Sequence, residues 1–328
     1  MTGLYDSFRR PVNYLRISVT DRCNLRCVYC MPESGIKQIS HQDILTYEEI
    51  HIVARAAAEL GINKVRLTGG EPLVRLGLTS LIDMLSNVEG IDDISLTTNG
   101  TLLGRCADDL KRAGLNRVNI SLDSLRSDRF RHITRSSYDV ADVLRGIDTA
   151  AAAGLVPVKI NVVVMGGIND DEILDFARKT VEEGWNVRFI EFMLTAGVAG
   201  DPARLIPVGE MKKRLASLGI LEPVSFHSGN GPARYYRFPG GAGTVGFITP
   251  VSEHFCFQCN RLRLTSDGKL RPCLLSDYEI DLKEPLRSGM SSSGLKELIE
   301  LAARSKPLRH HITEGHLPQG RPMTQVGG

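Results

Sequence analysis

The 328-residue sequence lacks long apolar runs and a strong excess of charge of either sign. No stretch approaches the roughly 18 apolar residues that span a bilayer, and the start, MTGLYDSFRRPVNYLRIS, lacks the apolar segment of a signal peptide. The 40 Lys and Arg nearly balance the 38 Asp and Glu, so no overall basic charge indicates a nucleic-acid or membrane partner. We therefore expect a cytoplasmic protein with neither kind of partner.

Cysteine is also scarce, with seven residues, but six of them fall into two groups of three. In a chain that is not secreted, reducing conditions disfavour disulfides and make metal or catalytic roles more frequent. The first group has the spacing C-x3-C-x2-C and the second C-x2-C-x13-C. Their members are Cys23, Cys27 and Cys30, then Cys256, Cys259 and Cys273. Cys106, in a predicted helix, is interpreted as an ordinary buried or semi-buried cysteine and not as a ligand.

Short β-branched runs alternate with amphipathic segments from Asn13 to about Met193. The predicted strands are YLRISVT, KVRLTGG, DISLTTNG, RVNISLD, VPVKINVVVM and NVRFIEFM, with helices such as 47–60 and 141–153. This alternation predicts a parallel sheet, either open and doubly wound or a full or partial barrel. Ligand sites in both folds lie where strands end, which selects residues 20–30, Gly69, Gly70, Thr97, Thr98, Ser121, Asp123 and Met193.

The alternation stops near residue 195. The segment that follows, to Gly243, is rich in Gly and Pro and has one clear predicted helix, at 208–218; a polar helical stretch follows at 294–303. We predict that residues 1–194 form the α/β domain. Residues 195–328 are then a smaller capping domain with the second cysteine group.

Each cysteine group offers three thiolates, one fewer than a closed site needs. A 4Fe-4S cluster normally takes four cysteines, so three leave one iron open to a ligand that is not protein. The alternatives are a zinc loop for the first group and a zinc knuckle completed by His254 for the second. Arg261 and Arg263 alternate in NRLRL, so an extended backbone points both guanidiniums to one side. Their place between cluster ligands favours an anion site over a solvated basic strand.

The first motif resembles the signature of the radical S-adenosylmethionine (SAM) superfamily, through its three cysteines, Tyr29 before the last of them, and TGGEP at residues 68–72. The resemblance narrows to the GTP 3′,8-cyclase family, the molybdenum-cofactor biosynthesis protein A group. The matches, in order over nearly the whole chain, are YLRISVTDRCNLRCVYCMP, VRLTGGEP, TTNG, VNISLDSL, VKINVVVM, RFIEFM, CNRLRLTSDGKLRPCL and the terminal GG. LTAGVAGDPARLIP and residues 217–242 do not align. The implied fold is a partial (βα)6 TIM-like barrel with a smaller C-terminal α+β domain.

The resemblance also implies the cofactors and the reaction. The implied cofactors are two 4Fe-4S clusters and S-adenosylmethionine. In the implied reaction, a 5′-deoxyadenosyl radical takes the C3′ hydrogen of GTP, and C3′ of the ribose then bonds to C8 of the guanine. The product, (8S)-3′,8-cyclo-7,8-dihydroguanosine 5′-triphosphate, is the first intermediate of molybdenum cofactor (molybdopterin) biosynthesis. A cyclic pyranopterin monophosphate synthase would receive this product. An electron donor of unknown identity would supply the enzyme with electrons. The resemblance leaves open whether the protein forms a homodimer.

Residue roles carried over by the resemblance follow the matching motifs. The cofactor would contact Tyr29, Gly70, Ser121 and Met193. GTP would contact Arg16, Arg66, Thr97, Lys159, Arg261, Leu262 and Arg263. Gly327 and Gly328 would form a tail that enters the active-site opening and assists catalysis near Arg16, rather than a merely flexible end.

The residues themselves support a dispersed anion site. No G-x4-G-K-S/T loop occurs in the chain, so a triphosphate would need scattered cations instead of a phosphate-binding loop. Arg16, Arg66 and Lys159 alternate with apolar neighbours on predicted strands, where a buried charge is costly without a function. We interpret these three residues as part of a binding site.

Two other functions stay open from the sequence. A radical SAM enzyme that modifies a peptide would usually carry more cysteines in its second domain than the three found here. A zinc-stabilised nucleic-acid-binding or scaffold protein fits poorly with a formal charge of +2, and zinc without sulfide in a metal analysis would support it.

Overall fold

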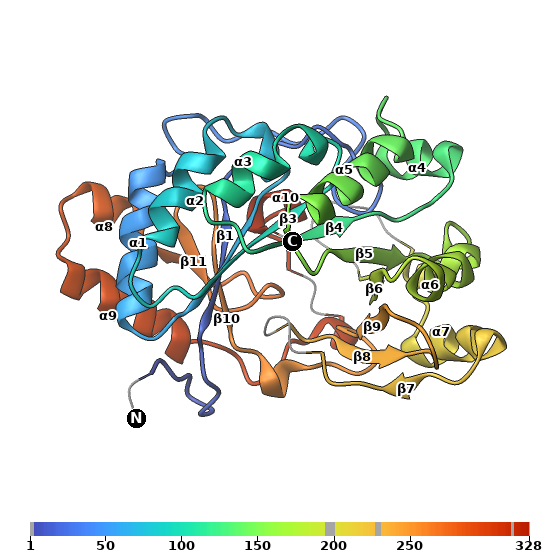
Figure 1. Cartoon of the computed structure of the whole chain (residues 1–328). Helices are drawn as coiled ribbons and strands as arrows, with labels where there is room; N and C mark the ends of the chain where they lie inside the picture. The colour runs from blue at the N-terminus through green and yellow to red at the C-terminus, as the bar shows by residue number, and fades with distance from the viewer. Residues whose placement is uncertain (1–2, 194–200, 227–230, 316–317, 328) are drawn as a thin grey trace.

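Twelve strands form one sheet in the computed structural model, which describes residues 3–193, 201–226, 231–315 and 318–327 (Figure 1). Their order across the sheet is β12-β11-β10-β1-β2-β3-β4-β5-β6-β9-β8-β7. The strands are β1 (Tyr14–Ser18), β2 (Lys64–Thr68), β3 (Asp93–Thr98), β4 (Arg117–Ser121), β5 (Lys159–Val164), β6 (Asn186–Glu191), β7 (Glu222–Pro223), β8 (Arg234–Arg237), β9 (Thr244–Ile248), β10 (Arg261–Leu264), β11 (Lys269–Arg271) and β12 (Ile280–Asp281).

The middle of the sheet is parallel and its two ends are antiparallel. β1 to β6 pair in sequence order, β10 joins β1 in parallel, and β9 joins β6 in parallel. β11 and β12 continue one edge and β8 and β7 the other, all antiparallel. This is the expected partial barrel, because each of the six central strands is followed by a crossover.

Apart from α10 (Met323–Val326), which lies at the centre of the molecule, the helices lie on the outer side of the sheet (Figure 1). The α-helices are α1 (Tyr47–Glu59), α2 (Leu78–Ser86), α3 (Ala107–Arg112), α4 (Ser127–Thr134), α5 (Val140–Ala152), α6 (Ile173–Glu182), α7 (Val208–Leu215), α8 (Lys283–Arg287), α9 (Ser292–Arg304) and α10 (Met323–Val326). α1 begins at Thr46 with a capping box, since Thr46 Oγ1 accepts from the Glu49 amide and Glu49 accepts from the Thr46 amide. Among the described residues, no helix is long and apolar enough to cross a bilayer.

The apolar core lies between the sheet and the helices rather than inside the barrel. In β1, Leu15 and Ile17 belong to this core, whereas Tyr14 and Arg16 face the cavity described below. Val65 and Leu67 of β2, and Leu262 and Leu264 of β10, are in the core in the same way. Successive strand residues point to opposite faces, so the polar residue between two apolar ones reaches the interior of the barrel.

The six predicted strands and the helices at 47–60, 141–153, 208–218 and 294–303 correspond to elements of the structure. One prediction is wrong in detail: Cys106 precedes α3 as its N-terminal cap instead of lying within the helix, because a 3-10 turn (Leu103–Arg105) ends there. The sequence also did not predict that β9 and β10, both after residue 195, extend the central sheet. A domain boundary near residue 195 stays a prediction.

Candidate active site

All six grouped cysteines lie in the wall of one cavity of about 330 Å³ inside the barrel. They are unpaired thiols, and each is partly buried. The cavity wall also contains the residues that the parallel-sheet argument selected at the strand ends, namely Gly69, Gly70, Thr97, Thr98, Ser121, Asp123 and Met193. Two segments that are more than two hundred residues apart in the chain therefore open into the same space.

The first cysteine loop is held against the end of β2. The Gly70 amide donates to the Thr20 carbonyl at 2.7 Å, and the Glu71 amide donates to the Arg22 carbonyl at 2.8 Å. A Cβ at Gly70 would overlap the Arg22 carbonyl oxygen and would lie 2.6 Å from its carbon. Only glycine permits this approach of two backbones, so the TGGEP segment fixes where the loop starts.

Glu71 links this contact to the end of β3. Its buried carboxylate accepts from Thr98 Oγ1 and from the Asn99 amide, both at 2.7 Å. Burial raises the pKa of Glu71 to about 7, although these hydrogen bonds act in the opposite direction. The Asn99 side chain then donates to Asn24 Oδ1 at 2.8 Å, within the cysteine loop. The loop is thus held at both its start and its middle.

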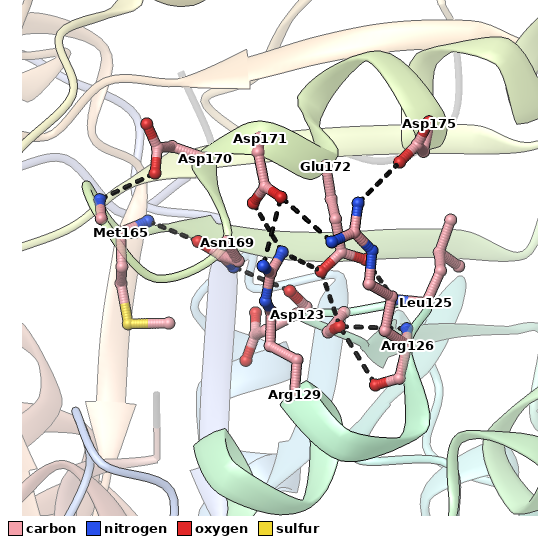
Figure 2. Close-up of polar contacts among 12 residues, drawn as sticks. Asp123, Leu125, Arg126, Arg129, Met165, Asn169, Asp170, Asp171, Glu172 and Asp175 are labelled. Carbon is pink, nitrogen blue, oxygen red and sulfur yellow. Dashed lines mark hydrogen bonds and ion pairs between the residues drawn. The ribbon is translucent and has the colours of Figure 1, made fainter.

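Tyr29 anchors the end of the loop to β4. Its hydroxyl donates to Asp123 Oδ2 at 2.7 Å, and the Val163 amide of β5 donates to Asp123 Oδ1 at 2.8 Å. Burial raises the pKa of Asp123 to about 6. The side-chain amide of Asn169 donates to the Asp123 and Val163 carbonyls at 2.7 and 2.9 Å (Figure 2). Asp123 therefore couples the cysteine loop to two strands.

A second polar network supports this corner from the outside (Figure 2). The buried Glu172 accepts from Ser124 Oγ and from the Leu125 amide, both at 2.7 Å. Arg129 of α4 donates to Glu172 at 2.7 Å and also pairs with Asp171. These contacts immobilise the segment after β4, which carries Asp123 toward the cavity.

Arginines from three adjacent strands line the opposite wall. Arg16 of β1 is in register with Arg66 of β2 and with Arg263 of β10. Burial, together with the neighbouring guanidiniums, lowers the pKa of Arg66 and Arg263 to about 10 and that of Arg16 well below its usual value. An anion bound among these guanidiniums would lower the free energy of the site, because it offsets the repulsion between them.

Lys159 and Arg188 extend this positive region to β5 and β6. Lys159 is 1% exposed, and its Nζ is 5.1 Å from the centre of the Phe226 ring. Burial first, and then Arg188, Arg117 and Arg66, lower its pKa to about 6. Lys159 does not belong to the cavity wall defined by the described residues, so it lies one layer behind it.

Arg188 is a cavity residue that the sequence analysis missed. It donates to Asn119 Oδ1 at 2.5 Å, and its Nε has no hydrogen-bond partner in the part of the chain that the structure describes. The signal was present, because Arg188 alternates with Val187 and Phe189 in NVRFIEFM just as Arg16 does with its neighbours in β1. The family resemblance assigned no role to Arg188.

The second cysteine group surrounds a basic strand. Cys256 begins a short 3-10 turn before β10, Cys259 ends it as the C-terminal cap, and Cys273 follows β11. Burial would raise the pKa of Cys259, but Arg261 and Lys306 outweigh this effect and lower it to about 6. Arg261 and Arg263 line the cavity, as the alternation predicts. The Leu262 side chain is packed in the apolar core, so a role in binding could involve only its main chain.

The C-terminal tail enters the barrel. The Gly327 carbonyl accepts from Arg263 Nη1 at 2.8 Å, and α10 lies at the centre of the molecule in Figure 1. Gly327 has a φ of +69°, and a Cβ there would overlap Thr68 Oγ1 and lie 3.2 Å from the Ser18 Cβ. Gly327 is therefore beside the ends of β1 and β2. Gly328 lies outside the described residues.

The geometry of the cysteines distinguishes the metal groups considered. No group of three His, Cys, Asp or Glu side chains within residues 3–193, 201–226, 231–315 and 318–327 is arranged to hold a single metal ion. A structural zinc requires its ligands to converge at about 2.0–2.3 Å, whereas the cysteines of a 4Fe-4S cluster each bind a different iron and lie further apart. His254 is exposed. Each group offers three thiols at the wall of one cavity, a donor set that fits a 4Fe-4S cluster with one iron open to a further ligand.

Two family models match the chain. The Radical SAM superfamily model covers residues 17–180, and the Molybdenum Cofactor Synthesis C model covers residues 185–312. The GTP 3′,8-cyclase of Moorella thermoacetica is 53% identical over 325 residues, which is 99% of this chain and 100% of that protein. The GTP 3′,8-cyclase of Pelotomaculum thermopropionicum is 52% identical over 327 residues, with 99% and 100% covered.

Solved structures share the fold at much lower identity. Streptococcus suis SuiB bound to S-adenosylmethionine matches with a TM-score of 0.59 and 13% identity, over 87% of this chain and 68% of that one. Native anSMEcpe with bound AdoMet matches with a TM-score of 0.57 and 16% identity, over 89% and 84%. These similarities bear out the partial barrel of the radical SAM type with a C-terminal domain.

Proposed function

Because the chain belongs to the GTP 3′,8-cyclase family of radical SAM enzymes, we propose that its cavity joins C3′ and C8 of GTP to form (8S)-3′,8-cyclo-7,8-dihydroguanosine 5′-triphosphate. This is the first step of molybdenum cofactor biosynthesis. The observation that carries the assignment is that two three-cysteine groups and a wall of buried arginines open into one cavity. An enzyme that must bring a radical source to a nucleotide triphosphate needs these three parts together.

The first half of the cavity would hold the radical source. Cys23, Cys27 and Cys30 would hold the first 4Fe-4S cluster, which with bound S-adenosylmethionine would supply the radical chemistry of the reaction. The backbone at Gly70 is open to a ligand because it carries no side chain. Tyr29, Ser121 and Met193 line the adjoining wall and would orient the cofactor.

The second half would hold GTP. Arg16, Arg66, Arg188 and Arg263 line the cavity and would bind the triphosphate through charge-assisted hydrogen bonds. Lys159 would add a positive charge behind them when the bound triphosphate raises its pKa. Thr97 Oγ1 faces the cavity without a hydrogen-bond partner among the described residues, as a substrate contact requires.

The second cysteine group would hold the guanine end. Cys256, Cys259 and Cys273 hold the second cluster, and Arg261 lies in the same wall of the cavity. Gly327 lies beside the ends of β1 and β2 and accepts a hydrogen bond from Arg263, so the tail would help to exclude water from the ribose. A cyclic pyranopterin monophosphate synthase would take the product, and a reductant would supply electrons.

Peptide modification is the less supported alternative. The solved structures of SuiB and anSMEcpe are 13% and 16% identical to this chain, and this similarity concerns the fold only. The cyclases of Moorella thermoacetica and Pelotomaculum thermopropionicum are 53% and 52% identical over 99% of this chain. The buried arginines also suit a triphosphate better than a neutral peptide.

The proposed function is tested by anaerobic single-turnover mass spectrometry. The reconstituted protein is mixed with reductant and S-adenosylmethionine, and release of 5′-deoxyadenosine is compared with and without GTP. We expect release to depend strongly on GTP and to accompany an isomer of GTP with the same mass. Release that does not depend on GTP would exclude GTP as the substrate. No release from a fully iron-loaded sample would exclude the radical chemistry.

Replacing Gly70 by Ala is expected to weaken S-adenosylmethionine binding at least tenfold, because the added Cβ overlaps the Arg22 backbone and displaces the first cysteine loop. Affinity is measured by equilibrium binding to the anaerobically reconstituted protein. The matched control is Gly209→Ala in α7, where a Cβ would contact nothing within 4 Å. Unchanged affinity in Gly70→Ala would mean that this close approach does not shape the cofactor site.

A further inference from the structure

Lys306 is a buried lysine on the protein side of the second cysteine group. It follows α9 and is 3% exposed. Its Nζ donates to the Arg261 carbonyl at 2.7 Å, to the Pro272 carbonyl at 3.0 Å and to Cys259 Sγ at 3.5 Å. An ammonium has three donors and no acceptor, so its donors match these three acceptors in number.

The contacts of Lys306 direct its ammonium at the protein around the second cysteine group. Within the described part of the chain, Lys306 does not belong to the cavity wall, whereas Arg261 and Cys259 do. Its charge is directed at a cluster ligand and at the two backbone segments, around Arg261 and Pro272, that carry the ligands Cys259 and Cys273. Any effect on the reaction must therefore pass through the cluster.

The N-terminal segment fixes this lysine in place. Arg10 donates to the Pro307 carbonyl at 2.7 Å and to the Leu308 carbonyl at 3.0 Å, directly after Lys306. The same guanidinium donates to the Cys256 carbonyl at 2.6 Å and pairs with the buried Asp6. These bonds hold the backbone beside Lys306 close to the backbone of Cys256, and the buried Nζ of Lys306 is held in turn by the Arg261 and Pro272 carbonyls.

We propose that Lys306 raises the reduction potential of the second 4Fe-4S cluster by donating a charge-assisted hydrogen bond to the sulfur of Cys259. The inference rests on the second cluster of the proposed function. When the cluster takes up one electron, its negative charge grows and spreads onto the ligand sulfurs. A fixed positive donor at a ligand sulfur stabilises that reduced form more than the oxidised form.

Lys306→Met tests the proposal, because methionine fills a similar volume without charge or donor. The reconstituted full-length protein is titrated with dithionite, and the reduced cluster is followed by electron paramagnetic resonance. The signal of the second cluster is the one that persists after Cys23, Cys27 and Cys30 are replaced by Ala. We expect the ratio of reduced to oxidised second cluster at a fixed potential to fall about tenfold, which is about 59 mV for one electron.

The control is Lys296→Met in α9. This substitution removes the same charge, but Lys296 is paired with Glu59 at 2.9 Å on the surface and not with a cysteine. We expect the potential of the second cluster to be unchanged in this variant. A shift as large as that of Lys306→Met would overturn the proposal, since the effect would then come from net charge alone.

Iron content separates the remaining outcomes. A wild-type protein with about four irons instead of about eight would lack a second cluster and would refute the proposed function itself. An iron-replete Lys306→Met with the wild-type potential would overturn the tuning role alone. If Lys306→Met loses iron, Lys306→Gln, which keeps a donor without the charge, is titrated instead. A lowered potential supports the proposal, whereas an unchanged potential or loss of iron in that variant as well overturns it.

Discussion

Gly327→Ala is expected to lower single-turnover cyclisation of GTP by about a hundredfold or more while leaving both clusters in place. The added Cβ overlaps Thr68 Oγ1 at the end of β2, and the φ of +69° disfavours any residue with a side chain. The tail must then leave the barrel, and the Arg263 bond to the Gly327 carbonyl is lost. The cysteines are in other segments, so iron binding does not depend on the tail.

Three measurements test this prediction. Product formation is followed by mass spectrometry, cluster content by iron analysis, and GTP affinity by equilibrium binding. Deleting Gly327 and Gly328 should reproduce the effect of the substitution, and Gly209→Ala should retain activity. Normal turnover by the truncated protein would refute the catalytic role of the tail. Loss of iron from it would show instead that the tail supports the clusters.

The central fold was predictable because each strand alternates in one consistent way. Val65 and Leu67 pack in the apolar core, and Arg66 between them faces the cavity. The alternation of apolar and polar residues therefore predicted both the strand and which of its faces packs against the helices. β9 and β10 could not be placed in this way. Each joins the sheet beside a strand that is distant in the chain, and pairing between distant segments leaves no local signal.

The site was predictable where a motif or a strand end marked it. The cysteine spacings identified six of the cavity residues, and the strand ends identified others such as Ser121 and Asp123. Lys306 was not identifiable, because nothing in SKPLRHH shows that its ammonium returns to Cys259. Arg10 was missed for the same reason, since its partners near residue 307 come from the other end of the chain.

Lys159→Met is expected to make the free protein more stable and to weaken its binding of GTP. Burial and three nearby guanidiniums hold the pKa of Lys159 at about 6, against 10.5 for an ordinary lysine. Between these pH values the unfolded chain binds one proton more than the folded chain at this residue. The wild-type free energy of unfolding therefore rises with pH over this window, and the cost of Lys159 is greatest near and below pH 6.

Methionine removes that cost. We expect Lys159→Met to raise the free energy of unfolding by roughly 5 kcal/mol near neutral pH, with the gain disappearing as the pH approaches about 10.5. Denaturant unfolding under anaerobic conditions at two pH values measures the difference. The surface variant Lys296→Met should change stability by less than about 0.5 kcal/mol at both. A gain that does not depend on pH would show that the titration of Lys159 is not its source.

GTP binding should show the opposite dependence on Lys159. A triphosphate beside the cluster restores the pKa of Lys159 toward its ordinary value, so binding should take up about one proton at a pH between about 7 and 8. Calorimetry in buffers of different ionisation enthalpy measures this uptake. In Lys159→Met the uptake should vanish and the affinity should fall about tenfold to a hundredfold, because the variant lacks the positive charge behind the triphosphate. Unchanged affinity and unchanged proton uptake in this variant would mean that Lys159 takes no part in GTP binding.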